Sequence, residues 1–284
     1  GTTMKSVKMA KSFLPNDEGA PDLPGYSRYI ALPQGAQAVL NVKNYRIETI
    51  TDVEIAPAPR IPLDTEKGPM EYNKDEKIYN KNAFYPAESF KLSEQTQLRG
   101  VDAVILGITP FQYNPVTKEL RIYRDVEVEV TYRGGNGHFG NDRLRSRWFD
   151  PILQDALLNY ESLPEIDYSA RYQQNRDDTG YEYLIVTPND NVWAGYAEQI
   201  KEWRTKQGIY TGIMTLDEIG TNTASGLESF FNDAYNNWDI PPVAVLLMAD
   251  YGTNADNSII SPIWDGYCAS DNIFADVNNN DMPD

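Results

Sequence analysis

The C-terminal third of the chain alternates short apolar runs with amphipathic helical segments, and this alternation is its strongest constraint on the fold. The runs 183–187 and 243–248 are typical of buried strands, and apolar side chains recur at helical spacing over 193–203 and 227–238. Strands that alternate with helices of this length pair in parallel, with helices on both faces of the sheet. We therefore predict an α/β/α half-domain with a partly parallel sheet over 181–284, whose chemistry lies at the carboxyl ends of its strands.

The predicted sheet is unfinished. Its third strand leads to Asp250, and the chain reaches Asp284 before a full set of strands can follow. We therefore expect this chain to be the front part of a longer polypeptide.

The N-terminal part of the chain reads as β structure. Val126, Val128 and Val130 alternate with charged residues, which is the period of a strand with one solvated face. Further strands are expected at 28–32, 38–42, 45–50, 53–56 and 101–108. Many short strands with Pro-rich breaks and no long helix favour an antiparallel β-sandwich or barrel.

A helix and a polar linker come after the β region. Asp150 as N-cap and Pro151 at the first helical position predict a helix start. The polar stretch 161–180 is typical of an interdomain linker. The predicted organisation is a β-rich domain over 1–160, a linker over 161–180 and the α/β half-domain over 181–284.

Composition excludes two classes of partner. The net charge of −17 argues against nucleic-acid binding, which needs clustered Lys and Arg. No run of about 18 apolar residues is present, so we expect no membrane span. A single cysteine rules out an internal disulfide but does not decide the compartment.

His138 and Cys268 are the only residues of their types, which raises the hypothesis of a Cys–His catalytic pair. However, His138 lies in the Gly-rich stretch 134–140 and Cys268 in a loop of the second part, and the sequence supplies no third, orienting group. We therefore predict that His138 is a solvated turn residue and Cys268 a packed small side chain.

The C-terminal segment is rich in oxygen side chains. Asp276, Asn278, Asp281 and Asp284 recur at short spacing, as in loops that give calcium its six to eight oxygen ligands. Carboxylates about 5 Å apart repel by roughly 3 kcal/mol per pair at an effective dielectric near 20, and a divalent cation would remove that repulsion. Asp250, at the end of a strand, is expected to face this loop. The alternative is a solvated Asn/Asp turn without metal.

Several segments in the first part carry a family resemblance. The run 111–123, Phe-Gln-Tyr-Asn-Pro-Val-Thr-Lys-Glu-Leu-Arg-Ile-Tyr, closely resembles the prodomain of gingipain-type cysteine peptidases, as do Gly100 and the run 20–24. In the second part, 203–208 is similar to the Trp-Lys-x-Gln-(Arg/Lys)-Gly element of their catalytic domain.

The resemblance continues to the end of the chain. The run 246–250 is similar to the family's Leu-Leu-Val-Gly-Asp strand end, with Ala249 in place of glycine. Ser270-Asp271 and the terminal Asp-rich loop match the segment before the family's Gly-Arg element, which is absent here. The colinear order of these matches covers nearly the whole chain.

The resemblance implies a precursor secreted to, or displayed on, the surface of a Gram-negative bacterium. It comprises a prodomain and the first half of a caspase-like catalytic domain that hydrolyses peptide bonds in polypeptide substrates. The family's catalytic histidine and cysteine are expected beyond Asp284, so the chain by itself should be inactive. Two alternatives stay open: a non-catalytic surface or binding protein on the same frame, and a sortase-like peptidase of the family that acts on exported proteins.

The resemblance also implies particular sites. It assigns structural calcium to Asp250, Asn278, Asp281 and Asp284. Processing between prodomain and catalytic domain is expected at Arg171 or Arg176, although an ordinary linker with two solvated arginines is the alternative. The prodomain should associate with its own catalytic domain, and the loop 60–67 is the candidate inhibitory segment.

Overall fold

The computed structural model describes residues 4–15, 17–63, 65–168, 179–251, 257–264 and 268–277. The chain forms two compact units, which cut it at positions different from the boundary expected at residue 160. The first unit comprises Gly1–Gln95, Asp102–Phe139 and Ala156–Ser162, and the second comprises Thr96–Val101, Gly140–Asp155 and Leu163–Asp284. The segments 96–101 and 140–155 lie in the part of the sequence expected to form the β-rich domain, but they pack with the C-terminal part.

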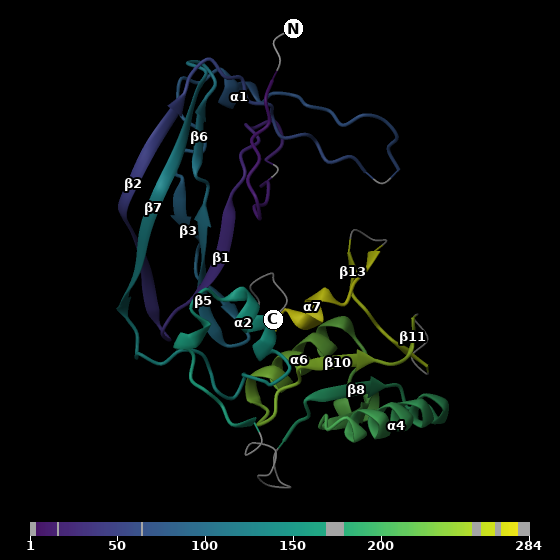
Figure 1. Ribbon diagram of the computed structural model, residues 1–284. Helices are drawn as coiled ribbons and strands as arrows, with labels where there is room; N and C mark the ends of the chain where they lie inside the picture. The colour runs from purple at the N-terminus through teal and green to yellow at the C-terminus, as the bar shows by residue number, and fades with distance from the viewer. Residues whose placement is uncertain are drawn as a thin grey trace. The chain divides into compact units, whose positions relative to one another are not determined.

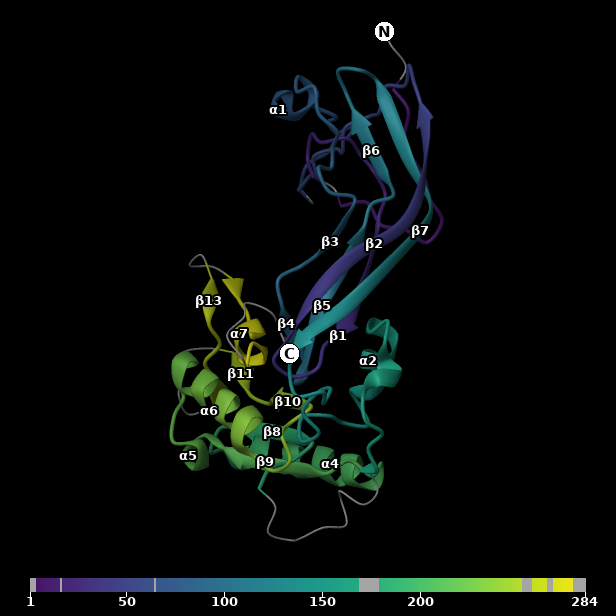
Figure 2. The same ribbon diagram turned by 90° about the vertical axis from the view of Figure 1, so that its left-hand side faces the viewer.

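The first unit is built from antiparallel strands. Its elements are β1 (Tyr26–Ala31), β2 (Ala36–Ile50), α1 (Glu76–Tyr79), β3 (Phe90–Leu92), β5 (Val101–Ile108), β6 (Phe111–Asn114), β7 (Glu119–Gly134) and the 3-10 turn η1 (Tyr160–Ser162). One sheet has the order β1-β5-β3 and another has the order β2-β7-β6. The long ribbon of β2 and β7 stands out in Figures 1 and 2.

The two sheets share a hydrophobic core. Leu32 and Leu106 pack with Leu40 and Val130 of the β2–β7 ribbon. A second cluster includes Tyr113, which is fully buried and donates from its hydroxyl to the carbonyl of Val53 at 3.0 Å. The alternation over β7 is confirmed, since its valines are half-buried and the intervening acidic residues are exposed.

The second unit contains the parallel sheet. Its elements are β4 (Thr96–Leu98), α2 (Asp150–Ala156), β8 (Tyr183–Thr187), α4 (Asn191–Lys206), β9 (Thr211–Thr215), α5 (Leu216–Ile219), α6 (Ala224–Asn237), β10 (Ala244–Leu247), β11 (Asp250–Tyr251), β12 (Ser258–Ile259), β13 (Ile263–Trp264), β14 (Cys268–Ala269) and α7 (Asn272–Ala275). The strand order β10-β8-β9 is parallel throughout, as the strand–helix alternation predicted.

Helices cover both faces of this sheet, with α4 and α6 on opposite sides of β8 (Figure 1). Leu184 and Val186 of β8 pack with Phe231 of α6. Both helices have side-chain N-caps, from Asp190 to α4 and from Thr223 to α6. Among the described residues, no helix combines the length and hydropathy needed to cross a bilayer.

Three expectations from the sequence were wrong in detail. The strands predicted at 38–42 and 45–50 are one strand, β2, with a bulge in its pairing near Asn44. The strand predicted at 53–56 makes only isolated bridges. Asp150 is the first residue of α2 and not its cap, because its side chain is engaged in an ion pair with Arg145.

The apolar side chains that recur at helical spacing over 193–203 do not all lie in the core. Tyr196 and Trp203 are 53% and 63% exposed, and Ala197 is the buried residue of this helix. Helical spacing of apolar residues defines a face, but it does not determine what covers that face.

Candidate functional site: an arginine strap on the α/β unit

Residues 140–150 of the second unit, here called the strap, make a dense set of polar contacts. The strap begins beside the turn between β4 and β5, where the amide of Asn141 donates to the carbonyl of Gly100 at 2.9 Å. A Cβ on Gly100 would lie 2.6 Å from Cδ1 of Leu144, so the approach of the two segments requires glycine here. The strap contributes three arginines, and the turn contributes Arg99.

Arg99 binds main-chain oxygens just before β10. Its Nη1 donates to the carbonyl of Pro242 at 2.8 Å, and its Nη2 to that of Pro241 at 3.3 Å. Its Nε donates to the carbonyl of Leu144 at 2.8 Å, and the residue is only 3% exposed. The guanidinium therefore ties the strap to the entrance of an edge strand of the sheet.

Arg143 caps the C-terminal end of α6. Its Nη1 donates to the carbonyls of Tyr235 at 2.9 Å and Trp238 at 2.8 Å. Its Nη2 donates to the carbonyl of Asn236 at 2.9 Å. The last carbonyls of a helix lack intrahelical partners, and the negative end of the helix dipole favours a cation there. The strap thus supplies a cap that α6 does not provide for itself.

Glu182 is the buried carboxylate of this site. It precedes β8, is 2% exposed, and its Oε2 accepts from the amide of Tyr210 at 2.9 Å. Arg147 Nη2 lies 3.2 Å from the same oxygen, and Trp148 Nε1 donates to Oε1 at 3.0 Å. Arg147 also donates to the carbonyl of Gly208. A buried carboxylate is tolerated only when it is paired and hydrogen-bonded, and the strap provides much of that pairing.

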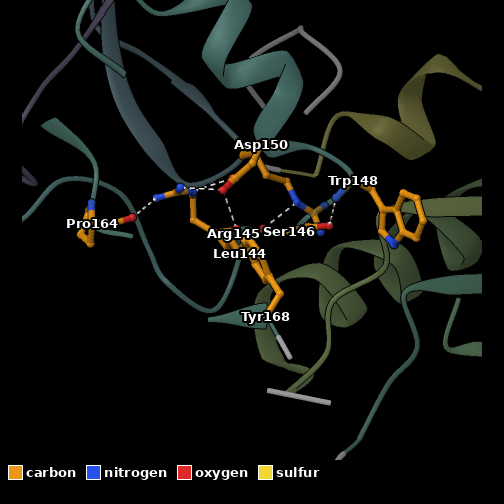
Figure 3. A network of polar contacts seen from close by, with 8 residues as sticks. Leu144, Arg145, Ser146, Trp148, Asp150, Pro164 and Tyr168 are labelled. Carbon is orange, nitrogen blue, oxygen red and sulfur yellow. Dashed lines mark hydrogen bonds and ion pairs between the residues drawn. The ribbon is translucent and has the colours of Figure 1, made fainter. Parts of the chain in front are cut away.

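Arg145 and Asp150 form a buried bidentate ion pair (Figure 3). Both nitrogen–oxygen distances are 2.7 Å, and the side chains are 2% and 12% exposed. The pair also holds the residues that come after α2: Arg145 Nη1 donates to the carbonyl of Pro164 at 3.2 Å, and the Tyr168 hydroxyl donates to Asp150 Oδ2 at 2.7 Å. Tyr168 is therefore anchored to the second unit.

A second anchor holds the chain at Thr179. Its amide and its hydroxyl donate to Asp239 Oδ2 at 2.9 and 2.8 Å, and these hydrogen bonds lower the pKa of Asp239. Gly180 forms a parallel bridge with Ile240, where an added Cβ would lie 2.2 Å from the Ile240 carbonyl oxygen. The expected processing residues, Arg171 and Arg176, fall between the two anchors and lie outside the described residues.

The residues predicted to bind calcium are only partly described. Asp250 opens β11, and its amide donates to the carbonyl of Asn257 at 3.1 Å. Asp276 comes directly after α7, while Asn278, Asp281 and Asp284 lie outside the described residues. Within the described part of the chain, no three metal-binding side chains come together. The calcium site stays a prediction.

The other sequence candidates lie in different places. His138 belongs to the first unit, where its amide donates to Asn136 Oδ1 at 2.8 Å, and Cys268 lies on β14 of the second unit. Arg60, in the candidate inhibitory loop of the first unit, pairs with Glu66 at 2.7 Å, and Glu66 Oε2 also accepts from the amide of Leu63. The loop is thus held by its own side chains.

Family models divide the chain at the segment between the two anchors. The model Propeptide_C25 matches residues 4–165, and the model of peptidase family C25 matches residues 176–284. The chain belongs to peptidase family C25. It is a gingipain-type cysteine peptidase precursor sequence, as the resemblance implied.

Individual relatives agree with this assignment. Gingipain R2 of Porphyromonas gingivalis is 26% identical over 293 residues, which cover 98% of this chain and 37% of that protein. Lys-gingipain HG66 of the same species is 27% identical, over 92% of this chain and 15% of the relative. The chain therefore spans only a minor part of these C25 proteins.

Two solved structures from the family are similar to parts of the chain. The complex of P. gingivalis RgpB pro- and mature domains gives a TM-score of 0.46 at 29% identity, over 53% of this chain and 77% of that one. A structure of gingipain K, described as showing zymogenic latency, gives a TM-score of 0.38 at 24% identity, over 44% of this chain and 71% of that one.

The C25 assignment shows which parts of the chain the polar contacts described above connect. Arg99, Arg143 and Arg147 lie in the propeptide-matched residues, whereas Glu182 and the carbonyls of 235–242 lie in the peptidase-matched residues. The contacts of Arg99, Arg143 and Arg147 are therefore contacts between propeptide and peptidase half within one compact unit. Sequence reasoning missed this site. Its signal was the alternating Arg143, Arg145 and Arg147 in a chain with a net charge of −17.

Proposed function

We propose that this chain is the N-terminal part of a secreted cysteine endopeptidase precursor that hydrolyses peptide bonds in proteins. The observation that supports it best is the strap, through which propeptide residues complete hydrogen bonds of the peptidase half. In such an enzyme a histidine activates a cysteine thiolate for acyl transfer, and backbone N–H groups stabilise the oxyanion. We expect that machinery in the rest of the protein, on a caspase-like sheet that β8, β9 and β10 begin.

The role of the propeptide in this proposal is to assist folding and maintain latency. Without the strap, the last carbonyls of α6 would lose the guanidinium of Arg143, and Glu182 would lose Arg147 and Trp148. Leaving a buried carboxylate with fewer partners costs several kcal/mol. The peptidase half should therefore fold poorly unless the propeptide is present. Inhibition by the loop 60–67 is proposed on family resemblance.

The test of the activity uses the full-length protein after processing. We expect it to cleave denatured casein and to lose this activity on alkylation with iodoacetamide, while residues 1–284 alone remain inactive. A processed full-length protein without iodoacetamide-sensitive cleavage would contradict the proposal. The folding role is tested separately, by comparing the soluble yield of the peptidase part with and without the propeptide supplied in trans.

Structural calcium is a subsidiary proposal, for Asp250 and Asp276 together with the oxygen side chains of 278–284. Calcium should raise the melting temperature of the chain and EGTA should lower it, because an ion that binds only the folded state stabilises it. Replacing Asp276 with Ala should abolish the difference. Equal melting temperatures of the wild-type chain in calcium and in EGTA would remove calcium from the proposal.

A further inference from the structure

The turn after β7 holds the only Asn-Gly sequence of the chain, Asn136-Gly137. This turn belongs to the first unit and leads into the strap, and the proposed function does not use it. Both residues are exposed to solvent. An asparagine before glycine can react with its own main chain, because glycine has no Cβ to hinder the approach of its nitrogen. The structure of the turn decides whether the reacting atoms meet.

Hydrogen bonds fix the carboxamide of Asn136 at both ends. Its Oδ1 accepts from the amide of His138 at 2.8 Å, and its Nδ2 donates to Gln34 Oε1 at 2.8 Å. The first of these closes an Asx turn, in which the side chain folds back over the following peptide. The main chain is held as well, since the Asn136 amide donates to the carbonyl of Gln34 at 3.2 Å and the Gln34 amide donates to that of His138 at 2.8 Å. Cγ of Asn136 is therefore held close to the nitrogen of Gly137.

The nitrogen of Gly137 is available as the nucleophile. Its N–H donates to no acceptor among the residues that the structure describes. An added Cβ at Gly137 would meet no atom within 4 Å, so water reaches this peptide and a new ring has room to form. Neighbouring Gly135 differs, because a Cβ there would lie 2.9 Å from Cβ of Ala36.

The amide of His138 also activates the carbon that is attacked. Attack on Cγ of Asn136 places negative charge on Oδ1, and the His138 N–H already donates to this atom. A main-chain donor that is in place before the reaction stabilises such an oxyanion without reorganisation. The same turn thus orients the nucleophile and stabilises the charge that develops, and both effects raise the rate.

We propose that Asn136 is a self-modification site, at which the chain converts asparagine to aspartate and isoaspartate. The nitrogen of Gly137 gives up its proton to water and bonds to Cγ of Asn136. The Cγ–Nδ2 bond breaks, and this nitrogen takes up a proton from water and leaves as ammonia, so a cyclic imide remains. Water then opens the imide. Breaking the new N–Cγ bond gives aspartate, whereas breaking the original main-chain bond gives isoaspartate, and every step is redox-neutral.

Either product changes the turn. A carboxylate at position 136 cannot donate to Gln34 Oε1, so that hydrogen bond is lost. Isoaspartate also lengthens the main chain by a methylene group just before the strap. The hydrogen bonds of the strap arginines use none of these atoms, so failure of this proposal leaves the proposed endopeptidase function untouched.

The test is incubation of the folded chain 1–284 at neutral pH, followed by trypsin digestion and mass spectrometry of the peptide 134–143. We expect release of ammonia, conversion of Asn136 to the acid form, and methyl labelling of the product by an isoaspartate-specific methyltransferase. Asn141, in the same peptide, is the matched control. Its Oδ1 accepts from the Arg143 amide at 3.1 Å in the same way, but Asp142 follows it in place of glycine, so we expect no conversion there.

Two variants and one comparison test the mechanism. Gly137→Ala places a Cβ beside the nucleophile and should slow the conversion at least about tenfold. His138→Pro keeps the Asn-Gly sequence but removes the N–H that donates to Oδ1, so it should slow the conversion several-fold in the folded chain and not in urea. The wild-type chain itself should react several-fold faster when folded than when unfolded in urea, a comparison that does not depend on the folding of any variant.

Three results would overturn the proposal. The first is a folded chain in which Asn136 converts no faster than Asn141. The second is equal conversion of the folded and the urea-unfolded wild-type chain, which would leave the turn without a role. The third is cleavage of the bond between Asn136 and Gly137, which would make Nδ2 the nucleophile in place of the Gly137 nitrogen.

Discussion

At the scale of single residues, the ion pair of Arg145 and Asp150 is the interaction whose loss should cost most. Arg145→Ala leaves a carboxylate that is 12% exposed without its bidentate partner, so we expect a loss of about 3 to 5 kcal/mol in unfolding free energy. Urea unfolding monitored by tryptophan fluorescence measures this in the second unit alone, because all five tryptophans lie there.

The control for Arg145 is an exposed pair in the same unit. Lys206 and Glu202 lie 2.6 Å apart on α4 and are 65% and 68% exposed. Lys206→Ala should lower the unfolding free energy far less than Arg145→Ala, since exposed pairs are screened by solvent. If both variants lose the same unfolding free energy, the buried Arg145–Asp150 pair stabilises the unit no more than an exposed pair does.

Asp239 gives a pH-dependent prediction. Hydrogen bonds from Thr179 lower its pKa below the ordinary 3.8, so its stabilising contribution is present above that pH and is lost as the pH falls through the lowered value. The Thr179 amide should exchange with solvent faster below about pH 3.8 after correction for intrinsic rates, and Asp239→Ala should have the same effect at neutral pH. The amide of Ala194, inside α4, serves as the unaffected reference. If neither change alters the exchange rate of the Thr179 amide, the hydrogen bonds to Asp239 do not hold the chain at this position.

At the scale of elements, α4 and α6 should respond differently to loss of an aromatic side chain. Phe231 of α6 is 2% exposed, and Phe231→Ala should cost about 3 to 5 kcal/mol through the cavity that it leaves. Trp203 of α4 is 63% exposed, so Trp203→Ala should change stability by less than about 0.5 kcal/mol. Circular dichroism during urea unfolding checks both, and a large loss for Trp203→Ala would refute its exposed position.

The elements themselves were largely predictable from sequence. β5, β7, β8 and the parallel pairing agreed with the periodicity, because burial on one or both faces fixes the pattern of apolar residues. The exposed stripe of α4 was not predictable in this way, since a stripe of apolar residues does not reveal which neighbour covers it.

At the scale of the whole molecule, the strap predicts the outcome of a proteolytic cut between the two anchors. Arg171 and Arg176 are the trypsin sites between Tyr160 and Tyr183, and the first cut is expected there. The two fragments should co-elute from a native size-exclusion column and separate on a denaturing gel, because the strap contacts do not depend on chain continuity.

The double variant Arg99→Ala/Arg143→Ala should let the cut fragments separate on the native column. Arg46→Ala/Arg124→Ala removes two exposed arginines of the first unit and should leave them together. A first cut outside residues 160–183, or dissociation of the cut wild-type chain, would contradict this account.

The functional site was less predictable than the fold. The family models match propeptide before peptidase, the order that the resemblance implied, but the resemblance did not reveal that 96–101 and 140–155 pack with the α/β part. Arg99 and Arg143 bind main-chain carbonyls. Because every residue has a main-chain carbonyl, the residues that accept these hydrogen bonds cannot be recognised from the sequence.

This choice of acceptor has an evolutionary consequence. Since every residue type offers the same carbonyl, the hydrogen bonds of Arg143 place no demand of their own on the side chains at 235, 236 and 238. For these hydrogen bonds, selection should therefore act on the arginine and not on the side chains of the residues that accept. Across homologues, covariation methods that look for paired changes would overlook this interface.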